Sequence, residues 1–123
     1  MKARLLLAFA ASAAALASAA DNPSVGGKWQ VHSSISGYEN DQVCTFVQKD
    51  DGLTGTCVSD QGTVEISGKI DGNKVAWSYK SEYNGSPLTV KFEGAVDPQA
   101  GIKGSVEVPE FGVGGDFTAT QAK

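Results

Sequence analysis

Short stretches of alternating apolar and polar residues run through most of the chain, from residue 27 onward. Strict alternation with a period of two is typical of a β-strand that has one buried and one solvent-exposed face. Turn-forming residues separate these stretches, and no helix-period segment follows the first twenty residues. The pattern predicts eight strands: Gly27–Ile35, Gln42–Gln48, Leu53–Val58, Thr63–Ile70, Lys74–Glu82, Leu88–Val96, Ile102–Val108 and Val113–Thr120.

Eight successive strands joined by short connections predict an all-β fold. An antiparallel sheet of this size can remove its unpaired edges by closing into an up-and-down (meander) barrel. The turns also predict the register. Asn84-Gly85 is a strong signal for a two-residue hairpin, because a type I′ turn needs positive φ at both positions. It pairs Tyr83 with Ser86 and, counted back, Trp77 with Phe92, so that the apolar residues of both strands share one face.

The two cysteines face each other in this register. The turn at Asp50-Asp51 pairs Phe46 with Gly55 and Cys44 with Cys57, with both cysteines pointing inward. We therefore expect a disulfide between neighbouring strands. A reactive or metal-binding thiol pair is the weaker interpretation, because no inward histidine or carboxylate stands near and metal sites usually need more ligands.

The first twenty residues have the features of a secretory signal peptide. Lys2 and Arg4 precede an apolar run at Leu5–Leu16, and small residues follow it, which predicts cleavage near Ala19 or Ala20. The run is too short to span a membrane. We expect a signal peptide at residues 1–20, an N-terminal arm at 21–26 and one barrel domain at 27–123, in a soluble periplasmic or secreted protein without membrane insertion.

The charge of the mature chain argues against nucleic acid as a partner. Without Lys2 and Arg4, the chain keeps 8 of its 10 basic residues against 14 acidic ones, and all eight are lysines. Proteins that bind nucleic acids rely on a positive face and on arginine forks. The outward positions of the predicted strands are mostly polar, so we expect a monomer.

In a meander, alternate connections lie at opposite ends of the barrel. Four richer connections share one end, called here the loop end: Gly37–Asp41, Asp60-Gln61, Tyr83–Ser86 and Pro109–Gly112. The termini and the other three turns share the opposite, tight-turn end. Inward aromatic residues gather toward the tight-turn end and smaller inward residues toward the loop end. This gradient predicts a barrel filled at one end and roomier at the other; a fully packed barrel is the alternative.

Binding residues are usually carried near loops on a rigid scaffold, which makes the loop end the candidate ligand site. The candidate ligand-binding residues are Ser33, Tyr38, Tyr79, Ser81, Tyr83, Leu88, Val90, Val106 and Phe111. No catalytic residue is assigned, since the single histidine, His32, points outward and away from any inward serine or cysteine. The acids near the loops are interpreted as solvated residues: Glu39, Asp41, Asp60, Glu82 and Glu110. No metal or cofactor is expected.

Several short motifs occur in an order known from other barrels. They are Gly27-Lys28-Trp29, Leu53-Thr54-Gly55-Thr56-Cys57, the Gly68 to Gly72 spacing, Val75-Ala76-Trp77 and Phe117-Thr118-Ala119. In these the chain resembles lipocalins and avidins (calycin-type meander barrels) and small exported bacterial barrels of undefined function. The resemblance implies a barrel that can hold a ligand. It does not imply biotin, because Cys57 replaces the tyrosine that ends the avidin motif.

Three functions follow as hypotheses. The first is a non-catalytic exported barrel that binds a small apolar molecule at the loop end. The second is a protein-interaction module, such as a protease inhibitor, with Asp21–Val25 as its inserting arm. The third, an isomerase or cyclase acting on an apolar substrate, would use Tyr79 as its acid.

Overall fold

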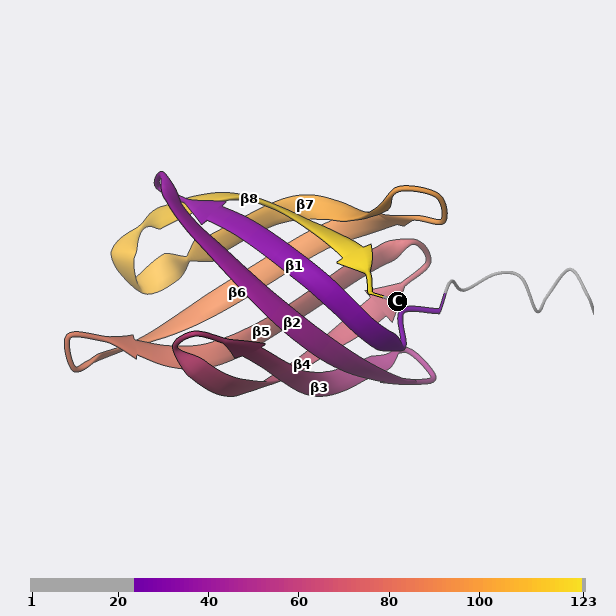
Figure 1. Ribbon diagram of the computed structural model, residues 1–123, viewed down its shortest axis with the longest axis horizontal. Helices are drawn as coiled ribbons and strands as arrows, with labels where there is room; N and C mark the ends of the chain where they lie inside the picture. The colour runs from indigo at the N-terminus through magenta and orange to yellow at the C-terminus, as the bar shows by residue number, and fades with distance from the viewer. Residues whose placement is uncertain (1–23, 123) are drawn as a thin grey trace, which may run out of the picture.

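The computed structural model describes residues 24–122, which form one closed antiparallel barrel of eight strands in up-and-down order (Figure 1). The predicted all-β meander barrel is therefore confirmed, whereas the predicted signal peptide lies outside the described residues. The elements are β1 (Gly27–Ile35), β2 (Tyr38–Lys49), β3 (Gly52–Ser59), β4 (Gly62–Asp71), β5 (Lys74–Tyr83), β6 (Ser86–Asp97), β7 (Gly101–Val108), the 3₁₀ helix η1 (Pro109–Phe111) and β8 (Val113–Gln121).

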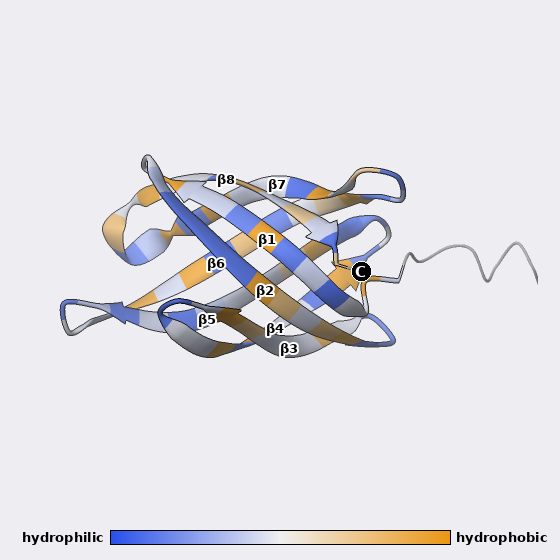
Figure 2. Cartoon of the chain, in the orientation of Figure 1, coloured by the Kyte–Doolittle hydropathy of each residue, from blue (hydrophilic) through white to orange (hydrophobic). Residues whose placement is uncertain are grey.

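The predicted register holds along the hairpins that the turns specified. Tyr83 pairs with Ser86 and Trp77 with Phe92 across β5 and β6. Pairing of β1 with β8 closes the barrel, which leaves no free edge between the first and last strands. Hydrophilic and hydrophobic residues alternate along the strands, as the colours of Figure 2 show. The alternation places the apolar set inside, because successive side chains of a strand point to opposite faces.

One predicted loop is wrong. We expected Gly37–Asp41 to be a loop, but β2 begins at Tyr38, directly opposite Ile35. Ser36 and Gly37 form a two-residue turn with φ of 51° and 82°. Positive φ at both positions is the type I′ geometry that matches the twist of a hairpin. Residues Tyr38–Asp41 therefore lie on a strand, and their side chains alternate between the two faces of the sheet.

The disulfide between Cys44 and Cys57 is present and joins β2 to β3, as predicted. Both cysteines are fully buried inside the barrel. A disulfide of this kind is expected in proteins that fold in an oxidising compartment and is consistent with export. Among residues 24–122, no helix has the length and apolar character needed to cross a membrane.

The N-terminal arm is partly built into the barrel. Val25 has 0% exposure, and its backbone N–H donates to Gln48 Oε1 at 2.8 Å. Its carbonyl oxygen accepts a hydrogen bond from Trp29 Nε1 at 3.0 Å. Val25 thus adds to the packing at the tight-turn end, where Figure 1 shows both ends of the described chain. Residues 21–23 of the arm lie outside the described residues.

The outer surface carries an apolar strip that the sequence analysis overlooked. Val43, Val47 and Val58 are exposed on the outer face of β2 and β3. Val43 and Val58 are directly paired across the two strands. Three exposed valines are an ordinary amount of apolar surface, so the strip by itself indicates no partner.

Candidate functional site

The two halves of the barrel are filled differently. In the half toward the tight-turn end, four aromatic rings form one cluster. Trp77 stacks on Phe92 with ring centres 5.0 Å apart. The ring centres of Phe46 and Phe117 lie 4.9 and 5.3 Å from that of Trp77. All four side chains are almost completely buried. Aromatic pairs in tilted, edge-to-face or stacked contact fill volume efficiently, so this half is the packed core that the sequence predicted.

The half toward the loop end is more accessible. Of the described hydrophobic residues that pack on the core while only partly buried, four lie in this half: Ile35, Val64, Tyr79 and Val113. Two inward polar residues of this half, Asn40 and Ser81, are also only partly buried. The fifth such hydrophobic residue, Val96, lies toward the tight-turn end. Since inward side chains of a closed barrel meet solvent through its ends, the interior is more exposed at the loop end than at the tight-turn end.

The candidate ligand residues fall into three layers. Four of them are buried in the barrel interior, namely Ser33, Leu88, Val90 and Val106. Above them, Tyr79 and Ser81 are half-buried. The last three, Tyr38, Tyr83 and Phe111, are exposed at the rim of the loop end. Tyr83 and Phe111 meet edge to face with ring centres 6.1 Å apart, although they come from β5 and η1. The structure therefore brings a buried apolar lining and an aromatic rim to the same end.

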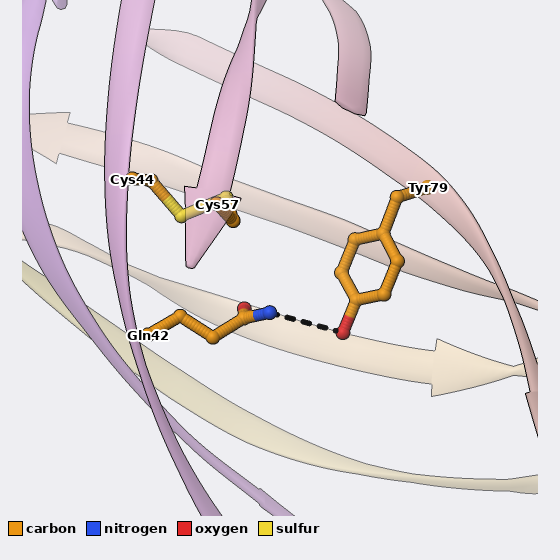
Figure 3. Close-up of a disulfide and its surroundings, with 4 residues drawn as sticks. All are labelled: Gln42, Cys44, Cys57 and Tyr79. Atoms are coloured by element: carbon orange, nitrogen blue, oxygen red, sulfur yellow. Dashed lines mark hydrogen bonds between the residues drawn. A yellow bond between two sulfur atoms is a disulfide. The ribbon is translucent and has the colours of Figure 1, made fainter. Parts of the chain in front are cut away.

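The sequence analysis missed Gln42 as a member of this site. Gln42 lies two residues before Cys44 on β2, points inward like it, and is only 6% exposed. Figure 3 shows its side chain reaching across the interior toward Tyr79 of β5, beside the disulfide. Its Nε2 donates to the Tyr79 hydroxyl at 3.4 Å. The alternation from Cys44 was the signal that could have revealed an inward amide.

Burial raises the pKa of Tyr79, and the hydrogen bond from Gln42 opposes this shift. The hydroxyl therefore stays protonated at neutral pH. A phenol in this state can donate and accept hydrogen bonds, but burial makes it a weaker acid than an exposed tyrosine. The Gln42–Tyr79 pair is thus suited to holding a polar group.

A second cluster lies on the outer face of the barrel. His32 on β1 meets two carboxylates of β2, with Nδ1 2.6 Å from Asp41 Oδ1 and Nε2 2.6 Å from Glu39 Oε1. The two acids are exposed, as expected, but their predicted place in a loop is wrong, because the type I′ turn at Ser36-Gly37 makes them strand residues that flank His32. Among the described residues, no group of three or more histidine, cysteine or acidic side chains is arranged to hold a metal ion.

Hydrogen bonds from the His32 ring to Asp41 and Glu39 raise the pKa of His32. In turn, hydrogen bonds with Ser34 and His32 lower the pKa of Glu39. An imidazole can donate from both nitrogens only when it is protonated, so the two carboxylates favour the imidazolium form. All three side chains are exposed, and the cluster is a surface ion-pair network.

Two surface hollows lie apart from the interior of the loop end. A groove of about 730 Å³ follows the outer side of β1, β2 and β3 beside His32, and its lining includes Asp60, Gln61 and Thr118. A second hollow of about 910 Å³ lies at the tight-turn end beside Trp29, Val96 and Pro98. Both are partly open to solvent, so neither encloses a small molecule completely.

No protein-family model, curated protein or solved structure matches this chain with significant similarity. The resemblance of its short motifs to lipocalins and avidins stays a prediction. The functional proposal therefore rests on the geometry of the barrel.

Proposed function

We propose that this protein is a non-catalytic exported barrel that binds one small, largely apolar molecule at its loop end. The observation that carries the proposal is the difference in burial between the two halves. The aromatic cluster around Trp77 is sealed from solvent, whereas Ile35, Val64, Tyr79 and Val113 are inward and still partly exposed. An eight-stranded barrel is wide enough to hold one small ligand when side chains do not fill it.

The chemistry of the lining supports an apolar ligand. Leu88, Val90 and Val106 provide apolar surface, and a few polar groups stand among them, principally Ser33 and Tyr79. A mainly apolar lining with few polar groups is the usual composition of a small-molecule site. The exposed rings of Tyr83 and Phe111 at the rim add apolar surface where a ligand would enter.

Export is part of the proposal. The leader-like residues 1–20 and the disulfide between Cys44 and Cys57 both fit a protein that folds in the periplasm or outside the cell. The interaction-module alternative is less well supported, because Val25 of its proposed inserting arm is buried in the barrel. The isomerase or cyclase alternative would rely on Tyr79, whose pKa is raised rather than lowered.

Titration of the mature protein with a panel of fluorescent apolar probes tests the proposal. We expect saturable binding, and we expect Val64→Trp to weaken it by about tenfold or more, because Val64 is inward beside Cys57 and a larger ring would occupy the space. Val58→Trp is the matched control, since Val58 lies on the adjacent strand but points outward. Absence of binding by every probe, or equal effects of the two variants, would contradict the proposal.

A further inference from the structure

A buried polar atom without a partner marks the interior below the loop end. Within the described part of the chain, two buried side-chain polar atoms have no hydrogen-bond partner: Trp77 Nε1 in the aromatic cluster and Gln42 Oε1 toward the loop end. Leaving such an acceptor unpaired costs about 1–3 kcal/mol, and the great majority of buried polar atoms in native proteins are paired. On β2 the next inward residues are the partly buried Asn40 toward the rim and the apolar Cys44 toward the core, so Gln42 is the deepest inward amide of this strand. The unpaired acceptor at Gln42 therefore points to a hydrogen-bond donor on a molecule outside the chain.

The hydrogen-bond geometry defines what that group must be. Gln42 Nε2 donates to the Tyr79 oxygen, which leaves Gln42 Oε1 as an acceptor and the Tyr79 O–H as a donor. Turning the amide over would instead leave the Nε2 hydrogens as donors and the Tyr79 oxygen as an acceptor, so either orientation leaves at least one donor and one acceptor. Because the two side chains are in contact, a single small group can reach both. A hydroxyl group, which donates one hydrogen bond and accepts others, is complementary to this pair.

The inward polar residues of the loop-end half argue for a neutral ligand. Acidic residues stand near the loop end, namely Glu39, Asp41, Asp60, Glu82 and Glu110. Several lysines lie in the opposite half, namely Lys28, Lys49, Lys69, Lys74 and Lys103. Glu39 and Asp41 are paired with His32, and Lys80 acts on Glu110, so these acids are partly compensated at the entrance. Among the described residues, the inward polar side chains of this half are neutral, namely Ser33, Asn40, Gln42, Tyr79 and Ser81, so no interior cation would pair with an anionic ligand.

We propose, on the basis of the binding function proposed above, that the ligand is a neutral apolar molecule ending in a hydroxyl group. The hydroxyl donates to Gln42 Oε1 and accepts from the Tyr79 O–H, while the apolar part lies among the inward side chains between this pair and the rim. A free carboxylate should bind more weakly, because no cation lies among the inward residues near Gln42 in the described part of the chain.

Displacement of a bound fluorescent apolar probe by three molecules with the same alkyl chain tests the inference. The three competitors are decanol, decyl methyl ether and decanoate. The ether accepts a hydrogen bond but cannot donate one, and the carboxylate is charged. We expect decanol to displace the probe at about tenfold lower concentration than the ether, with decanoate weaker than decanol.

Two variants connect that preference to the named residues. Gln42→Met keeps an unbranched side chain but removes the amide, so decanol should lose its advantage while the ether is little affected. Tyr79→Phe removes only the hydroxyl and keeps the ring beside Phe92, whose centre lies 6.1 Å away. It should reduce the preference in the same direction, and it serves as the test if Gln42→Met fails to fold.

The possible results separate the two proposals. Equal displacement by decanol and the ether, or tighter binding of decanoate, would overturn the hydroxyl inference and leave the binding function intact. A preference for decanol that survives both variants would also overturn it. If the apolar probe itself does not bind to the wild-type protein, the proposed function fails, and the inference fails with it.

Discussion

Gly68 on β4 lies directly opposite Trp77 on β5, and the two strands approach too closely there for any side chain. A Cβ atom at Gly68 would lie 1.9 Å from the carbonyl oxygen of Ala76 and 2.7 Å from Trp77 Cα. Both of these atoms belong to the backbone, so a side chain at this position would push the strands apart. The close approach lets the small barrel curve around its aromatic core.

We expect Gly68→Ala to lower the free energy of unfolding by about 3 kcal/mol or more, because the contact cannot be relieved by moving a flexible side chain. Denaturant titration measures the change. Gly26→Ala is the control, since a Cβ atom there would lie 3.8 Å from the carbonyl oxygen of Phe46, an ordinary contact distance; it should change stability by about 0.5 kcal/mol or less. A Gly68→Ala protein as stable as the wild type would show that β4 and β5 do not approach so closely.

Removal of the disulfide should destabilise the barrel without changing its fold. Cys44 and Cys57 close a loop with a sequence separation of 13, for which the loss is about 3 kcal/mol. The double variant Cys44→Ala, Cys57→Ala should therefore unfold at lower denaturant concentration. A reductant should shift the wild type toward the variant and leave the variant unchanged. If reductant does not change the denaturant concentration at the midpoint of wild-type unfolding, the result would argue against the disulfide.

The ion pairs of His32 predict a dependence of stability on pH. The pKa of His32 is raised above its ordinary value of 6.5. The stability that His32 contributes is therefore fully present below pH 6.5 and is lost as the pH rises through the folded-state pKa. The pKa of Glu39 is lowered from 4.5, so the stability that Glu39 contributes is present above pH 4.5 and is lost as the pH falls through the folded-state pKa. The network should stabilise the fold most between pH 4.5 and pH 6.5.

An NMR titration of the His32 ring checks this directly, because the chain has a single histidine. The measured pKa should exceed 6.5 and fall toward it in a protein with both Glu39→Gln and Asp41→Asn. His32→Gln should remove the loss of stability that the wild type shows as the pH rises above 6.5. High salt should weaken the effect, since all three groups are exposed and surface charges are screened. A wild-type value at or below 6.5 would contradict the network.

Val25 should contribute to stability although it precedes the first strand. Val25→Ala removes two methyl groups from a fully buried position, and we expect a loss of about 2 kcal/mol. Ser24→Ala, at an exposed neighbour, is the control and should have little effect. If Val25→Ala leaves the unfolding midpoint unchanged, the arm does not pack at the tight-turn end, and its proposed role as an inserting arm regains support.

The sequence by itself determined the number of strands, their order, most of the register and the disulfide. These features follow from local information: alternation defines the inward face, and a tight turn such as Asn84-Gly85 or Asp50-Asp51 sets which residues pair across a hairpin. The pairing of Cys44 with Cys57 needed only a count of residues from the turn. The gradient from aromatic to small inward residues was visible for the same reason.

Only the tertiary structure decided how the polar residues of Tyr38–Gln42 are used. This run is too polar to stand out as a strand, so its true turn at Ser36-Gly37 was overlooked, and with it the flanking of His32 by Glu39 and Asp41. The contact of Gln42 with Tyr79 joins β2 to β5 across the interior of the barrel. Strands that are not neighbours meet in this way only when the sheet curves and closes, and no count along the chain contains that curvature.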